Sequence, residues 1–187
     1  MNPFILNVPV LRSERLRLRA PTLDDFPQSY AMWSDPVVTH FIGGRPHTKE
    51  EVWARLLRNI GHWQAIGYGY WVVELADGGY VGQVGFSDHR RDLDPPLDGL
   101  PEMGWVLTPS AHGQGFAFEA SRAALEWRDA ALPPGQTFCI IAPEHVSSLR
   151  VAEKLGFRRG NDAIYHGSTR AVLWRESLPT GGLTEPF

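Results

Sequence analysis

Two glycines, Gly113 and Gly115, stand directly in front of a pattern typical of a helix, in the stretch AHGQGFAFEASRAALEWRDAAL. A turn without side chains presents its main-chain N–H groups to whatever lies against it, and the helix dipole adds about half a positive charge there. Such a turn binds an anion without needing a lysine. The residue types and their spacing predict a phosphate-binding turn, with an ordinary strand-to-helix connection as the alternative.

The two better known phosphate-binding loops do not fit these residues. A P-loop ends in Gly-Lys-Ser or Gly-Lys-Thr, and no such run occurs in the chain. A dinucleotide fingerprint needs a third small residue where Phe118 stands, and it normally follows the first strand of its fold. The phosphate-binding interpretation that is left is a glycine turn whose donors are main-chain amides.

The patterns before the turn predict a first strand, two early helices and a hairpin. Strict alternation predicts a half-buried strand over residues 15–19. Capping signals that begin at Thr22 and Thr48 predict the two helices. Two apolar runs on either side of Asp77-Gly78-Gly79 predict strands joined by a hairpin turn. The polar segment 87–101 is predicted to be a loop within one domain.

A strand–helix–strand crossover is predicted around the glycine turn. The strand EMGWVL, Glu102–Leu107, leads into the turn, and the apolar strand TFCIIA, residues 137–142, follows the helix. A last helix, capped by Ser147 or Ser148, is predicted to end before Gly156. Such a crossover is right-handed and places the N-terminus of its helix at the carboxyl end of the first strand, where ligands usually bind.

The sequence HGQGFAFEA resembles the acetyl-CoA pyrophosphate loop of the GNAT N-acetyltransferase superfamily, whose pattern is Gln/Arg-x-x-Gly-x-Gly/Ala. His112, Gly115 and Ala117 occupy the patterned positions, and Gly113 is the frequent additional glycine. EMGWVLTP is similar to the family's preceding strand, and PEHVSSLRVAEKLGF to its following helix. Residues 13–48 resemble the opening of the branch that contains the ribosomal-protein-alanine N-acetyltransferases. Four matches in the family's order cover nearly the whole chain.

The resemblance implies an α+β fold of three layers, in which helices flank a central mixed, mainly antiparallel sheet. One parallel pair of strands in that sheet is expected to be splayed apart. A single GNAT-like acetyltransferase domain is expected over residues 1–178. The composition of residues 179–187 predicts a flexible tail.

The resemblance also implies acetyl-CoA as the cosubstrate and indicates the residues that bind it. These are Val106, Leu107 and Thr108 on the strand, His112, Gly113, Gln114, Gly115, Phe116 and Ala117 at the turn, and His145 before the next helix. Val106 would donate its main-chain N–H to the acetyl carbonyl, although alternation alone makes it plain core. Two positions depart from the family pattern. His112 replaces Gln or Arg, so that a side-chain contribution to phosphate binding is weaker or depends on pH, and His145 replaces Asn.

Acetyl transfer to an amine needs groups that move protons. An alkylammonium with a pKa near 10.4 must lose its proton before it attacks, and the resemblance places an acid, Glu102, near the incoming amine. The alternative is a solvated carboxylate at a strand edge. A proton donor assists the departing thiolate, and the tyrosine that many family members use for this is Ala152 here. Ser148, directly or through water, is the substitute, with a helix-cap hydroxyl as its alternative.

Four further residues are candidates for the acceptor site. Asp88 and His89 lie on the loop after VGQVGF, His40 lies between the first two helices, and Trp33 lies at a helix end where an acceptor pocket would form. A polar loop, an incidental histidine and a core tryptophan are the alternatives. No spacing of His, Cys, Asp or Glu indicates a metal site.

Composition limits the class of protein. The 187 residues suit one domain, and the net charge of −3 argues against a general nucleic-acid binder. Cys139 is the only cysteine and lies in an apolar strand, which excludes an internal disulfide and favours a reducing cytoplasm. No apolar stretch approaches the roughly 20 residues that a bilayer requires, so a soluble cytoplasmic protein without a membrane partner is predicted.

The leading hypothesis is an acetyl-CoA-dependent N-acetyltransferase in which an amine attacks the thioester directly in a ternary complex. The acceptor is a protein N-terminal amine, as in the ribosomal-protein branch, or a small amine such as an aminoglycoside or a polyamine. A polycation would be favoured by the loop acids Asp88, Asp92, Asp94 and Asp98. The second hypothesis is a non-catalytic acyl-CoA-binding or sensing module, because His112, His145 and Ala152 replace usual family residues. A monomer and a homodimer both fit the sequence.

Overall fold

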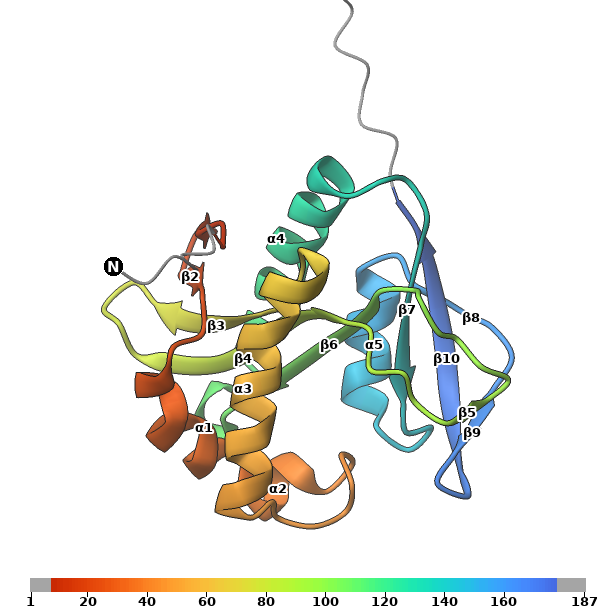
Figure 1. Cartoon of the computed structure of the whole chain (residues 1–187), viewed down its shortest axis with the longest axis horizontal. Helices are drawn as coiled ribbons and strands as arrows, with labels where there is room; N and C mark the ends of the chain where they lie inside the picture. The colour runs from red at the N-terminus through yellow and green to blue at the C-terminus, as the bar shows by residue number, and fades with distance from the viewer. Residues whose placement is uncertain (1–7, 178–187) are drawn as a thin grey trace, which may run out of the picture.

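Between residues 8 and 177, the part of the chain that the computed structural model describes, the strands form one sheet (Figure 1). Their order is β1-β2-β3-β4-β6-β7-β10-β9-β5, and β8 pairs with β10. The strands are β1 (Leu11–Arg12), β2 (Leu16–Arg19), β3 (Tyr70–Leu75), β4 (Tyr80–Ser87), β5 (Leu93–Asp94), β6 (Glu102–Leu107), β7 (Gln136–Ile141), β8 (Arg158–Arg159), β9 (Ala163–Tyr165) and β10 (Ser168–Glu176). The predicted tail at 179–187 lies outside the described residues.

The sheet is antiparallel except at one place. β6 and β7 run parallel, and they are paired only through Glu102 and Phe138. Beyond that pair the two strands diverge, because β6 continues along β4 while β7 continues along β10. The expected mixed, mainly antiparallel sheet with a splayed parallel pair is confirmed.

The helices are α1 (Phe26–Trp33), α2 (Pro36–Thr39), α3 (Lys49–Ile66), α4 (Phe116–Ala131) and α5 (Val146–Lys154). The capping box at Thr48 is present: its hydroxyl accepts from the Glu51 N–H at 3.2 Å, and the Glu51 carboxylate accepts from the Thr48 N–H at 2.8 Å. The last helix differs from its prediction. It begins at Val146 with His145 as the N-cap, so both serines lie inside its first turn.

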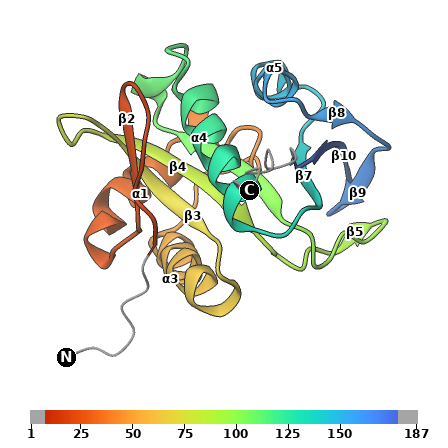
Figure 2. The same ribbon diagram turned by 90° about the horizontal axis from the view of Figure 1, so that it is seen from above.

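Two layers of helices enclose the sheet, as Figure 2 shows, with α4 on one side and α1 and α3 on the other. On the α4 side, Phe86 of β4 and Met103 of β6 pack with Ala120 and Ala124 in the main core. Burying a side chain the size of Phe86 contributes about 1.5–3 kcal/mol. On the other side, Val106 packs against the smaller core of α1, α2 and α3. Odd-numbered and even-numbered residues of β6 therefore face opposite layers.

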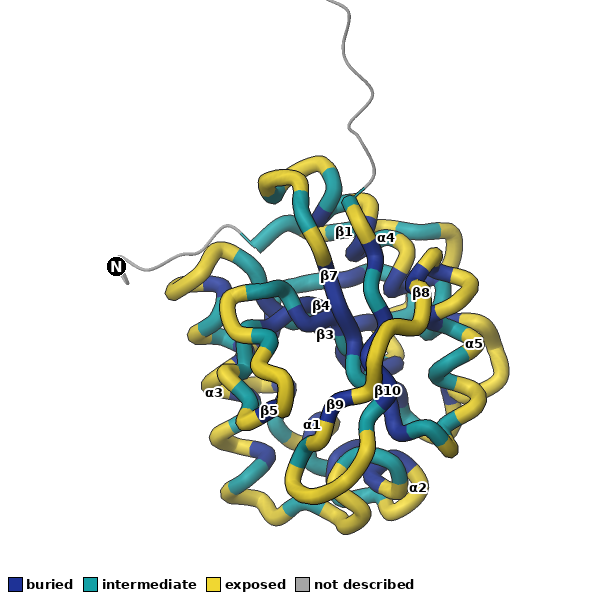
Figure 3. The backbone as a smooth tube through the Cα atoms, turned by 90° about the vertical axis from the view of Figure 1, so that its right-hand side faces the viewer, coloured by how far each residue is buried: buried dark blue, intermediate teal, exposed yellow. Residues whose placement is uncertain are grey.

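The burial of the strands varies across the sheet. Figure 3 shows β4 and β7 buried at the centre, while β5 and β9, at the end of the sheet, each combine buried and exposed residues. Cys139 on β7 is buried and unpaired with another cysteine, as predicted. None of the helices between residues 8 and 177 combines the length and apolar composition that crossing a bilayer needs.

Candidate active site

The glycine turn is built as an opening onto the first turn of α4. Gly113 has a φ of +75° and Gly115, the N-cap of α4, has a φ of +80°. Side-chain-bearing residues adopt such angles only with strain, so glycine is needed at both positions. Within the described residues, the main-chain N–H groups of residues 113–117 donate to no protein acceptor. These amides are therefore available to an anion at the positive end of the helix dipole.

A fixed cation stands beside this turn. Arg15, from the connection between β1 and β2, donates from Nη1 to the Gln114 carbonyl at 3.0 Å and from Nε to Glu119 at 2.7 Å. Its guanidinium lies 4.5 Å from the ring centre of Phe116. The sequence pattern had placed Arg15 only in an alternating strand, so its position beside the turn could not be predicted. Arg15 therefore brings a guanidinium next to the turn, where its charge is paired with Glu119 at 2.6 Å.

The pairing of β6 with β4 decides which main-chain groups face the gap between β6 and β7. Thr108 donates its N–H to the Val81 carbonyl at 2.9 Å. Hydrogen-bonded pairs alternate along an antiparallel ladder, so Val106, opposite Gln83, also directs its main chain toward β4. The prediction that Val106 supplies the free amide is therefore wrong, and the Thr108 amide is occupied as well.

The neighbouring residues of β6 face the gap instead. By the same alternation, Trp105 and Leu107 direct their N–H and C=O groups away from β4. The Leu107 carbonyl accepts from Nε2 of His112 at 3.0 Å, which agrees with this orientation. His112 thus holds the end of β6 rather than reaching freely to a ligand. The amides of Trp105 and Leu107 are the ones placed to meet a carbonyl in the gap.

One side-chain hydrogen bond crosses from β6 to α5. Nε1 of Trp105 donates to Oγ of Ser148 at 3.1 Å. Because the serine oxygen accepts from the indole, its own hydrogen is free to be donated elsewhere. Ser148 therefore sits in the first turn of α5 as a donor at the gap, and its partner Trp105 was not identified from the sequence.

His145 and His40 lie next to each other through an aromatic contact. The ring of Phe41 lies 4.5 Å from the ring of His40 and 4.3 Å from the ring of His145, measured between centroids. Burial, together with the charges of His112 and His40, lowers the pKa of His145. A neutral imidazole at neutral pH is the consequence, with one N–H to donate. The loop before α3 thus closes over the start of α5.

On the opposite face of the sheet, Glu102 is held by an arginine. The carboxylate is only 5% exposed, and it accepts from Nε of Arg91 at 2.7 Å and from Nη2 at 2.9 Å. Burial opposes the charge of Arg91, but the hydrogen bonds to Glu102 outweigh it and raise the pKa of Arg91. Glu102 is thus a buried and oriented carboxylate rather than a solvated one at a strand edge.

Tyr70 of β3 reaches across the sheet toward Glu102. Its hydroxyl lies over Gly104, where a β-carbon would collide with it, and its Cα occupies the space of a side chain at Gly85. The two glycines let the ring lie against β4 and β6. Burial and the charge of Glu102 raise the pKa of Tyr70 to about 12, so the phenol stays protonated at neutral pH. Sequence reasoning missed this residue, whose only signal was the pair of facing glycines.

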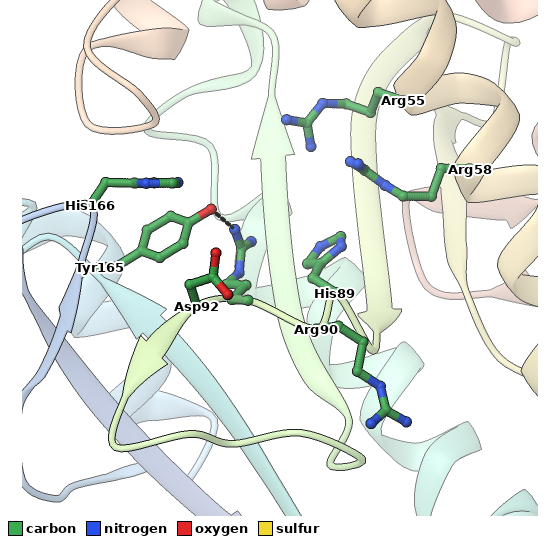
Figure 4. Close-up of a pocket in the computed structure, with 8 residues that line it drawn as sticks. Arg55, Arg58, His89, Arg90, Asp92, Tyr165 and His166 are labelled. Carbon is green, nitrogen blue, oxygen red and sulfur yellow. Dashed lines mark hydrogen bonds between the residues drawn. The ribbon is translucent and has the colours of Figure 1, made fainter.

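A cavity of about 260 Å³ opens on this face and is lined by Arg91, the partner of Glu102. It is lined by Arg55, Arg58, His89, Arg90, Arg91, Asp92, Tyr165 and His166. Figure 4 shows Arg55 and Arg58 extending into it from α3, with Tyr165 and His166 on the far side and Arg90 turned away. Four arginines make the cavity mainly basic, and of the four loop aspartates only Asp92 lines it, so this cavity is not the acidic pocket that the loop aspartates suggested.

The structure separates the residues that the sequence grouped as an acceptor site. His89 lines the cavity, and burial with the charges of Arg91 and Arg58 lowers its pKa to about 2. Trp33 does not line the cavity; it is buried and stacks under the Arg55 guanidinium at 4.0 Å. Asp88 also lies outside this cavity and forms an ion pair with Arg90 at 2.9 Å. His40 is exposed and lies on the cofactor side, near His145.

The profile of the GNAT acetyltransferase domain matches residues 15–158, which is most of the chain. The chain belongs to the GNAT acetyltransferase family. A Bordetella pertussis protein assigned to the GNAT family is 32% identical, with 89% of this chain and 99% of that chain covered and a TM-score of 0.79. The N-acetyltransferase YnaD of Bacillus subtilis is 26% identical over 149 residues, which cover 80% of this chain and 82% of that protein.

More distant GNAT structures share the fold. A Vibrio cholerae spermidine N-acetyltransferase, in complex with CoA and spermine, is 17% identical with a TM-score of 0.70, and covers 88% of this chain and 97% of its own. A Salmonella typhimurium acetyltransferase that modifies the N-terminal serine of ribosomal protein L7/L12 is 14% identical with a TM-score of 0.71, and covers 90% and 99%. GNAT members thus include enzymes for proteins and for small amines.

Proposed function

We propose that this GNAT enzyme transfers an acetyl group from acetyl-CoA to a primary amine, which attacks the thioester directly in a ternary complex. One observation carries the proposal. The strand β6 joins two sites: its carboxyl end leads to five unengaged amides at the start of α4, and its amino end carries Glu102 on the opposite face. We infer that the thioester and the amine meet at β6, where β6 and β7 diverge beyond Glu102 and Phe138.

The residues that would hold acetyl-CoA are provided mainly by the main chain. The diphosphate would be bound by the N–H groups of residues 113–117, with the Arg15–Glu119 ion pair at their side. The amides of Trp105 and Leu107 face the gap and would donate to the acetyl carbonyl oxygen. One donor aimed at the charge that develops there lowers the barrier by about 3–4 kcal/mol. His145 would contribute a single N–H to the pantetheine arm.

Glu102 is the proposed acceptor of the amine proton. A carboxylate has about four lone-pair positions, and Arg91 occupies two of them, so Glu102 can accept from a further donor. The Tyr70 hydroxyl, protonated at neutral pH, lies on the same face and would orient the amine. On the other side of β6, Ser148 has a free hydrogen for the departing thiolate.

The family includes enzymes for peptide and for small-amine acceptors, and we choose among them by the charge of the cavity. Spermidine is the acceptor of a distant relative, but a polycation would be repelled by the arginines that line this cavity. The proposed acceptor is therefore a primary amine that is not a polycation, at a peptide N-terminus or in a small molecule.

Thiol release separates catalysis from a non-catalytic acyl-CoA-binding role. Purified protein is mixed with acetyl-CoA and a panel of amino acids, short peptides and polyamines, and free CoA is followed with a thiol reagent. We expect release that depends on at least one amine, and a several-fold lower rate for Ser148→Ala. Binding of acetyl-CoA by calorimetry without release for any amine would favour the sensing module instead.

A further inference from the structure

We propose that the acceptor is a small amine that also carries a carboxylate or phosphate group, and that Arg55 and Arg58 bind this group. The inference rests on the proposed function, because it assigns the acceptor of that same site. It starts from the balance of charge in the cavity beside Glu102.

Two of the four arginines in the cavity have partners and two do not. Arg91 is bound to Glu102, and Arg90 to Asp88. Within residues 8–177, no ion pair or hydrogen bond involves the guanidinium of Arg55 or of Arg58. Arg55 is half-buried and Arg58 is exposed. Asp92 also lines the cavity, but among the described residues it forms no ion pair with either arginine. A half-buried charge without a partner costs free energy, so Arg55, with Arg58 beside it, is expected to receive an anion from outside.

The guanidinium of Arg55 is preorganised to bind an anion. Its Nε is fully buried without a hydrogen-bond partner, and its guanidinium plane stacks on the Trp33 ring at 4.0 Å. The stacking fixes the orientation of the fork, so little side-chain entropy is lost when a ligand binds. Burial, reinforced by the charge of Arg58, lowers the pKa of Arg55 to about 10, so it remains a cation at neutral pH.

Arg58 lies one turn further along α3 and extends into the same cavity (Figure 4). Desolvation and, second to it, the positive charge of Arg91 lower the pKa of Arg58, so the neighbouring arginines disfavour each other's charge. A planar carboxylate or a phosphate accepts two or more charge-assisted hydrogen bonds from such a pair, and these bonds would relieve the repulsion.

The rest of the cavity fits the amine end of such a molecule. Glu102 does not itself line the cavity, but it is bound to Arg91, which does, and Arg91 in turn donates to the Tyr165 hydroxyl at 3.1 Å. A molecule with an anionic group at Arg55 and Arg58 would therefore extend its amine toward Glu102 and Tyr70. The volume of about 260 Å³ lies just below the usual range for ligand pockets of roughly 300–1,000 Å³, which suits a molecule of amino-acid size.

The diphosphate of acetyl-CoA is not the expected occupant. The glycine turn belongs to the start of α4, whose helix packs on one face of the sheet, whereas Arg55 and Arg58 belong to α3 on the opposite face. The glycine turn would therefore bind the diphosphate of acetyl-CoA, and Arg55 and Arg58 would bind the anionic group of the acceptor on the other face of the sheet.

Matched pairs of amines test the proposal. At saturating acetyl-CoA, kcat/KM is measured for β-alanine against β-alaninamide, for O-phosphoethanolamine against ethanolamine, for each common amino acid against its amide, for tripeptides with an acidic first residue, and for spermidine. We expect anionic small amines to be preferred about tenfold to a hundredfold over their neutral partners. Arg58→Gln should abolish most of this preference, and the exposed helix-surface variant Arg122→Gln should retain it.

Other outcomes overturn the proposal or part of it. A preference for neutral amines or spermidine would refute the claim that the acceptor carries an anionic group. A preference for acidic tripeptides would refute the claim that it is a small molecule. An equal loss for both members of a pair in Arg58→Gln would indicate a structural role, and Arg55→Lys, which keeps the charge, checks folding of that position.

A binding measurement keeps the inference separate from the proposed function. Glutarate and inorganic phosphate are titrated calorimetrically into protein saturated with CoA, which leaves the glycine turn occupied. Binding that weakens at least tenfold in Arg58→Gln supports the arginine site even if no amine is acetylated. If neither anion binds but neutral amines are acetylated, the proposed enzyme activity stands and the proposed anion site is refuted.

Discussion

Two regions on opposite faces of β6 are both suited to anions, and they are built in opposite ways. The glycine turn uses main-chain amides from one continuous stretch, residues 113–117, whose donors carry no net charge. The cavity on the other face uses arginines from α3 and from the loop before β5, with Tyr165 of β9 and His166 of the following turn on its far side. The first is determined by local conformation, and the second exists only after distant segments have packed.

The two constructions also differ in cost. Amides at a helix start need no desolvation of a full charge, and they cannot titrate. Guanidinium groups gathered in a cavity lose hydration and repel one another, and both effects lower the pKa values of Arg55 and Arg58. The arginine site should therefore respond to ionic strength and to charge-removing substitutions, while the glycine turn should respond to backbone strain.

The largest effect is expected at Glu102, where the amine loses its proton. Glu102→Gln should lower kcat by a hundredfold to ten-thousandfold, because the general base is lost while size is kept. The affinity for CoA, measured by calorimetry, should hardly change, since the glycine turn is on the other side.

The matched variant at Glu102's partner separates catalysis from structure. Arg91→Gln removes the same ion pair and leaves the carboxylate in place. Similar losses of kcat in the two variants would show that only the ion pair matters, and that the base lies elsewhere.

The glycine turn should be sensitive to backbone strain. Gly115→Val places a branched side chain at a φ of +80°, and distortion of the amides should weaken CoA binding by about a hundredfold, as read by calorimetry. Gly78→Val has the same type of strain, at +92°, in the β3–β4 turn. It should lower the melting temperature without lowering CoA affinity. Equal weakening by both variants would contradict a local role for the turn.

Tyr70→Phe should have a smaller effect on the acceptor side. Loss of one hydrogen bond to the amine should lower kcat/KM by about twofold to fifteenfold, with CoA affinity unchanged. Tyr80 is the control, since its pKa is also raised to about 12, mainly by burial, and its hydroxyl bonds to Ser29 and Gln83. Tyr80→Phe should affect stability only. Turnover that falls equally in both would remove Tyr70 from the site.

The smallest effect concerns His89 and pH. Its pKa is about 2 in the folded protein and near 6.5 when unfolded, so the unfolded chain binds an extra proton below pH 6.5. The contribution of His89 to stability is thus complete above pH 6.5 and falls as pH decreases, by at most about 1.4 kcal/mol per unit. In urea unfolding at pH 5 and pH 7, His89→Gln should show a smaller pH difference than the unchanged protein. An unchanged difference would mean that His89 is solvated and titrates normally.

The sequence indicated the parts whose signals are local. The capping box at Thr48, the hairpin turn at Asp77-Gly78-Gly79 and the glycine turn before α4 each lie within a few residues, and each has the predicted structure. The family resemblance supplied the splayed strands and the enzyme class. The sequence could not show which residues of β6 direct their N–H groups toward β4, because this depends on how β6 pairs with β4. Val106 was therefore predicted to supply the free amide, whereas Trp105 and Leu107 face the gap.

What the chain by itself determined was a helix start with free amides, because glycine conformation and the helix dipole arise from neighbouring residues. What only the tertiary structure decided was the sign of the charge in the acceptor cavity. The loop acids suggested a site for a cation, but folding turns Asp88 to Arg90 and brings Arg55 and Arg58 of α3 beside Glu102. The electrostatic potential in the cavity depends on the distances between charges in space and not on their separation in the sequence. Its sign could therefore be known only once the fold had placed the charged side chains.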